Sequence, residues 1–88
     1  MGNNSIPVEQ KVEIAQRILE RAMRISDSTK HDIFVWYAPH VNNIEVHIHR
    51  GGWKNSKKST TLEVDFGSSY DIDGEVANIH AIFDSLEG

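Results

Sequence analysis

Two histidines and two acids are the residues whose types and spacing could do chemistry. His47 and His49 alternate along one segment, and Glu63 and Asp65 alternate along another. If both segments are β-strands, residues two apart share a face. Two histidines and a carboxylate on one face are a known metal-ligand set, so a metal site at His47, His49, Glu63 and Asp65 is one alternative. No fourth ligand is in view, and a solvated face with histidine–acid pairs is the favoured interpretation.

The pairing of the two segments decides which acid each histidine meets. A register that sets Glu45 opposite Asp65 is disfavoured, because like charges directly opposite each other are destabilising. We therefore predict the register that places His49 opposite Glu63 and His47 opposite Asp65. Histidines beside acids change charge near neutral pH. The alternative function of this face is therefore either a metal site or a pH-responsive site at His47 and His49.

An alternation of apolar and polar residues predicts that these segments are the two arms of a β-hairpin, over residues 43–50 and 60–66. Its apolar face, which we expect to be core, contains Ile44, Val46, Ile48, Leu62, Val64 and Phe66. Its polar face contains Glu45, His47, His49, Thr61, Glu63 and Asp65.

Two helices and a further strand must position this hairpin. Apolar residues at three- and four-residue steps predict helices over about 7–25 and 74–87, with residues 26–30 as a connection and Asp73 as the N-cap of the second helix. Residues 32–38 are β-branched and aromatic almost throughout, which predicts a strand. The order αβββα predicts an α+β fold with a three-stranded antiparallel sheet. The helices should pack on one face, because the polar face of the hairpin has no apolar partner for them.

Length and composition narrow the class of protein. The chain has 88 residues and no cysteine. We expect it to form one domain in which residues 1–6 are flexible. No segment approaches the roughly 20 apolar residues of a membrane span, so we expect a cytoplasmic protein with no membrane partner. Neither a nucleophile motif nor a phosphate-binding glycine loop is present. We therefore expect no enzymatic activity and no cofactor.

Charge is unevenly distributed along the chain. The net charge is −4, and residues 63–88 contain seven acids and no lysine or arginine. The hairpin loop is basic and contains Arg50, Trp53, Lys54, Lys57 and Lys58. Cations beside an aromatic ring can bind a nucleic-acid backbone, which is the second alternative. A solvated loop is favoured over it, because four basic residues are few in a negatively charged domain.

The αβββα order resembles that of double-stranded-RNA-binding domains. In that family a lysine cluster at the start of the second helix binds phosphates. Here the same place contains Asp71, Asp73 and Glu75. The resemblance covers the element order but not the motif, so it does not imply RNA binding.

The first strand gives the preferred functional hypothesis. In a sheet covered on one face, either Phe34 and Trp36 or Val35 and Tyr37 must point to the open side. Aromatic residues ringed by polar groups are typical of the centre of a protein interface. We expect a small binding module that contacts a protein partner through Phe34, Trp36, Glu45, His47, His49, Glu63 and Asp65. Edge strands can also pair with a second copy, so a homodimer is a further expectation.

Overall fold

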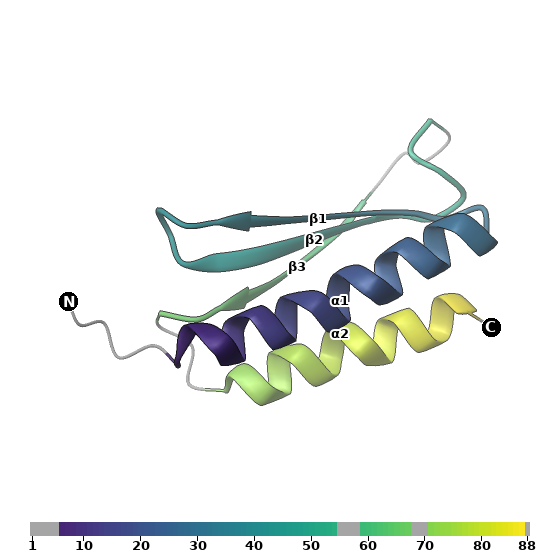
Figure 1. Ribbon diagram of the computed structural model, residues 1–88. Coiled ribbons are helices and arrows are strands. Elements are labelled where there is room, and N and C mark those ends of the chain that lie inside the picture. Colours follow the sequence, from purple (N-terminus) through teal and green to yellow (C-terminus); the bar gives the residue numbers. More distant parts are fainter. Residues whose placement is uncertain (1–5, 55–58, 68–70, 88) are drawn as a thin grey trace.

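The computed structural model describes residues 6–54, 59–67 and 71–87. The elements follow the order α1 (Val8–Ser28), β1 (Asp32–Ala38), β2 (Asn43–His49), β3 (Thr60–Asp65) and α2 (Ile72–Glu87). The strands form one antiparallel sheet in the order β1-β2-β3. Both helices lie side by side along one face of this sheet, and no described element covers the other face (Figure 1). The predicted α+β fold is confirmed.

The first helix is longer than predicted. The hydroxyl groups of Ser28 and Thr29, which were expected to end the helix, instead bond to carbonyls of its last turn. Ser28 Oγ donates to the Arg24 carbonyl at 2.7 Å, and Thr29 Oγ1 donates to the Ile25 carbonyl at 2.7 Å. The Thr29 N–H also donates to the Ile25 carbonyl, at 2.9 Å. Side chains that compete with helix in other contexts here bond the carbonyls of the final turn. Residues 26–28 are therefore helix and not connection.

The second helix begins two residues earlier than predicted, and its cap is Asp71 instead of Asp73. Asp71 Oδ1 accepts a hydrogen bond from the Gly74 N–H at 2.9 Å, which is the geometry of an N-cap. A Cβ at position 74 would collide with the Asp71 carboxylate, so a larger residue there would displace the capping side chain. Asp73 and Glu75 lie in the first turn, where negative charge complements the helix dipole.

The predicted register of the hairpin, with His49 opposite Glu63, is wrong. Glu63 lies opposite Glu45, and His47 lies opposite Thr61. The observed register differs from the predicted one by four residues along β2. A shift by an even number of residues leaves the same side chains on each face of the sheet, so the apolar pattern does not distinguish the registers.

The like-charge pair is accommodated because each carboxylate has its own partner. Glu45 Oε1 lies 3.0 Å from His47 Nε2. Glu63 Oε1 accepts a hydrogen bond from Asn43 Nδ2 at 2.7 Å. Asp65, which was predicted to face His47, lies opposite Asn43. The charge rule used to choose the register therefore omitted two nearby partners, His47 on the same strand as Glu45 and Asn43 on the strand next to Glu63.

The core lies between the sheet and the two helices. Helix α1 contacts β1 and α2, while α2 contacts β3. Ile6 packs against this core, and the rest of the segment expected to be flexible lies outside the described residues. No helix in the described ranges is long and apolar enough to cross a bilayer. The buried apolar residues are Ile18, Ala22, Ile25, Ile44, Val46, Ile48, Val64, Phe66, Ile79, Phe83 and Leu86.

Candidate functional site: the open face of the sheet

The pairing of β1 with β2 decides which aromatic residues face the open side. Phe34 lies opposite His47, and Trp36 lies opposite Glu45. Val35, between them, is on the face covered by the helices. Of the two alternatives left open by the sequence, the structure therefore places Phe34 and Trp36 on the open face.

Four rings form a connected group across β1 and β2, which we call the ring cluster: Phe34, Trp36, His47 and His49. The Trp36 and His47 rings are stacked, with centroids 4.4 Å apart and an interplanar angle of 10°. Phe34 meets His49 edge to face at 5.3 Å and meets Trp36 edge to face at 6.5 Å. Both Phe34 and Trp36 remain open to solvent, with 40% and 48% of their surface exposed. The cluster is therefore an ordered but uncovered aromatic surface.

Hydrogen bonds hold His47 at the centre of this cluster. Its Nε2 lies 3.0 Å from Glu45 Oε1, and its Nδ1 lies 3.3 Å from Thr61 Oγ1. A neutral imidazole with its proton on Nε2 satisfies both contacts, because it donates to the carboxylate and accepts from the hydroxyl. The His47 ring is thus held by one hydrogen bond at each ring nitrogen and by stacking on Trp36.

Carboxylates line the ring cluster on its β2 and β3 sides. Glu45, Glu63 and Asp65 belong to the same open face by strand register. Among the described residues, no three His, Cys, Asp or Glu side chains are placed to hold a metal ion together. The structure thus brings the predicted partner-binding residues to one face without gathering the alternative metal ligands into a cluster.

The basic loop lies at one end of the hairpin. Trp53 is 58% exposed, and Lys54 Nζ lies 6.0 Å from the centre of its ring. Arg50 Nη1 donates to Thr60 Oγ1 at 2.8 Å. Lys57 and Lys58, which complete the alternative nucleic-acid site, lie outside the described residues.

A polar cluster between the helices was missed in the sequence. Arg21 Nη2 on α1 lies 2.7 Å from Asp84 and 2.8 Å from Glu87 on α2, and its Nη1 lies 3.1 Å from His80 Nδ1. Burial and the nearby Arg21 charge lower the pKa of His80. Burial lowers the pKa of Arg21, but the hydrogen bonds that Arg21 donates to Asp84 and Glu87, together with their negative charge, outweigh it and leave that pKa raised. These partners are more than 50 residues apart in sequence, so only the tertiary fold shows the cluster.

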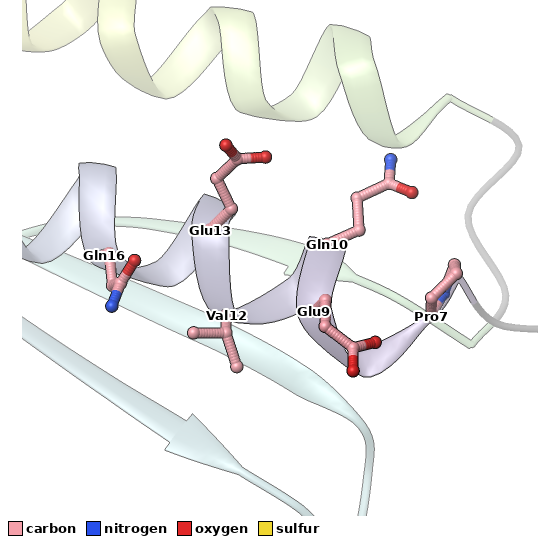
Figure 2. A pocket seen from close by; sticks show the side chains of 6 residues that line it. All are labelled: Pro7, Glu9, Gln10, Val12, Glu13 and Gln16. Carbon is pink, nitrogen blue, oxygen red and sulfur yellow. The ribbon is translucent and has the colours of Figure 1, made fainter.

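One surface hollow lies along the first half of α1, away from the ring cluster. Its lining residues all come from the start of this helix (Figure 2): Pro7, Glu9, Gln10, Val12, Glu13 and Gln16. Gln10 and Glu13 point toward α2, whereas Glu9 and Val12 point to the opposite side. The polar groups therefore do not converge on a common point, as they do in a typical ligand site.

Comparisons with protein-family models, with curated proteins and with solved structures found no match to this chain.

Proposed function

We propose that this chain is a small non-enzymatic binding module that docks on a protein partner through the open face of its sheet. The observation that carries the proposal is the ring cluster, in which Phe34 and Trp36 stay 40% and 48% exposed although both rings are held in place by histidines. Aromatic anchors at the centre of a patch with a polar rim are the usual anatomy of a protein interface.

The exposed aromatic area is large enough to anchor a partner. An aromatic side chain presents roughly 150–250 Å² to its surroundings, so the exposed part of each ring is on the order of 100 Å². Covering that area yields about 2.5 kcal/mol per ring at about 25 cal/mol per Å². Contacts within the cluster already orient the rings, which reduces the conformational entropy lost on binding.

The rim of the face indicates the charge of the partner. Glu45, Glu63 and Asp65 lie on this face, and the whole chain has a net charge of −4. Such a rim repels phosphate and favours a partner surface that is neutral or basic. A protein with exposed lysine or arginine beside apolar residues fits this chemistry better than a nucleic acid does.

Affinity capture with matched variants tests this proposal. The native chain and a Phe34→Ser, Trp36→Ser variant are used as bait in extract from the cell that makes the protein, and bound proteins are identified by mass spectrometry. A control variant, Val41→Ser, removes an apolar side chain of similar exposure from the turn between β1 and β2. We expect a partner that is retained by the control and lost by the open-face variant. A partner set that the open-face variant retains in full would refute the proposal.

The exposed tryptophan of the hairpin loop supports a second candidate function, binding of a nucleic-acid backbone. Trp53 is 58% exposed, with Lys54 near its ring and Arg50 at the start of the loop. Such a site gives a gel shift that weakens with salt. The shift should disappear in Trp53→Ala and persist in Trp36→Ser. A shift that is unchanged in Trp53→Ala would reject this candidate.

A further inference from the structure

The two free edges of the sheet are protected to different degrees. On β3, the Asp65 N–H donates to Glu75 Oε1 at 3.1 Å, and Glu63 places a charge on the same edge strand. On β1, the Ile33 N–H donates to Ser26 Oγ at 3.0 Å. From Ile33 to Ala38, β1 contains neither proline nor charge. Natural sheets normally protect an edge with such residues, so β1 is an unusually bare edge.

Backbone groups on this edge are available for hydrogen bonding. In an antiparallel pair, residues alternate between those that bond the neighbouring strand and those that point away from it. The Ile33 N–H points to Ser26 and hence away from β2. Val35 and Tyr37 follow at two-residue steps, so their N–H and C=O groups also face outward. Within the described ranges, no side chain or loop is seen to bond them.

Helix α1 provides an apolar surface beside the same edge. Val8, Val12, Leu19 and Met23 are 61%, 47%, 46% and 63% exposed, and their spacing of four, seven and four residues places them along one side of the helix. Ser26 continues this line, seven residues after Leu19, and contacts β1 at its free edge. The exposed apolar line therefore lies on the β1 side of the molecule and not on the α2 side.

We propose that these features form a second docking surface, the edge site, which accepts one extended segment of a partner protein as a fourth strand. The edge site consists of the outward backbone groups of Val35 and Tyr37 and the exposed apolar line of α1. Outward backbone groups at every second residue can hydrogen-bond to an extended chain. The exposed apolar line of α1 can contact a segment that has apolar residues at every second position. This proposal does not depend on the open-face proposal.

Charge further specifies the segment. Exposed Glu9, Glu20 and Asp27 lie one helical step beyond the apolar line, on its outer border. Arg24 pairs with Glu20 at 3.0 Å, so Glu9 and Asp27 give this border its negative charge. An acidic segment would be repelled there, so the edge site accepts a neutral or basic one.

The position of α1 argues against a second copy as the occupant. Helix α1 lies beneath β1, the edge strand itself. Pairing β1 with β1 of another copy would place the two strands about 5 Å apart, with an α1 helix under each. Packed helices need about 8–10 Å between their axes, so the helices would collide. A strand without a helix beneath it meets no such obstacle.

A displayed library of random ten-residue peptides, selected on the immobilised full chain, tests the edge site. We expect enriched peptides to have apolar residues at alternate positions and few acids. The best peptide is then synthesised and its affinity measured by calorimetry. Val35→Pro removes an outward N–H without removing a bond to β2, because proline is tolerated at such edge positions. Glu63→Pro makes the same change on the β3 edge. The Asp65 N–H points away from β2, toward Glu75, so the N–H of Glu63, two residues earlier, also points outward.

Several outcomes separate the proposal from its alternatives. Val35→Pro should weaken peptide binding roughly tenfold, and Leu19→Ser, Met23→Ser should weaken it by at least tenfold. Glu63→Pro should leave binding within about twofold. Arg17→Ser should do the same, because Arg17 is an exposed residue of α1 that lies off the apolar line and pairs with Glu13. No enrichment of alternating peptides, or equal loss in the two proline variants, would overturn the edge site. Concentration-dependent dimerisation that protects the Val35 and Tyr37 amides from hydrogen exchange would overturn the choice of occupant. Loss of peptide binding in Phe34→Ser, Trp36→Ser alone would assign the peptide to the open face instead.

Discussion

Replacement of Trp36 by threonine should cost little folding free energy, although tryptophan is the largest side chain type in the protein. Trp36 is 48% exposed, so about half of a surface of up to roughly 250 Å² is covered in the folded state. At about 25 cal/mol per Å² this coverage is worth at most about 3 kcal/mol, since the unfolded chain already buries part of it. Threonine retains strand preference and part of the contact with His47. We expect a loss of about 1–2 kcal/mol.

Urea unfolding followed by far-ultraviolet circular dichroism measures this loss without relying on tryptophan fluorescence. Ile79→Ala serves as the comparison, because Ile79 is 1% exposed and its truncation should cost about 2–5 kcal/mol. The free energy lost by Trp36→Thr should be clearly the smaller of the two. If Trp36→Thr destabilises the fold as much as Ile79→Ala, the ring is a structural element of the core and the argument for a free docking surface fails.

The cluster between the helices gives two further predictions. Because the pKa of His80 is lowered, the unfolded chain takes up a proton first as pH falls, so the free energy of unfolding decreases below about pH 6.5. His80→Gln should reduce this decrease in urea titrations between pH 7 and about pH 5, and an unchanged slope would contradict the assignment. Arg21→Met should cost about 1–2 kcal/mol, because it removes ion pairs with the partly exposed Asp84 and Glu87. Thermal unfolding should show this cost shrinking in about 1 M salt, and a salt-independent cost would show that packing dominates.

The element order was predictable because the helices and the hairpin have clean periods and the first strand has a distinct composition. Alternation placed the hairpin strands, and β-branched and aromatic residues placed the first strand, within one residue of their observed ends, at Asp32–Ala38, Asn43–His49 and Thr60–Asp65. The ends of the helices were harder to predict. Ser28 and Thr29 favour loops on average, but here they bond carbonyls of the last turn of α1. Local preference could not show this, because the hydroxyl group can bond in either setting.

The faces of the candidate site were predictable, whereas the pairing within it was not. Alternation assigned Glu45, His47 and Glu63 to one polar face without reference to the register. The register then depended on a charge rule, and that rule failed because His47 and Asn43 each bond one of the two opposed carboxylates. The residues of β1 that face the open side could be identified only from the structure, because a strand that is apolar on both faces has no alternation to distinguish them.

Site-specific photocrosslinking in the cell tests whether a partner docks on the open face. A benzophenone amino acid is placed at Thr61, which is exposed and lies opposite His47, or at Asn78, an exposed position on α2. Both variants are irradiated in the cell that makes the protein, and the products are identified by mass spectrometry. We expect a defined crosslinked protein from position 61 that is absent from position 78 and lost when Phe34→Ser and Trp36→Ser are added. The same products from both positions, or products from position 61 that survive the loss of both rings, would contradict this expectation.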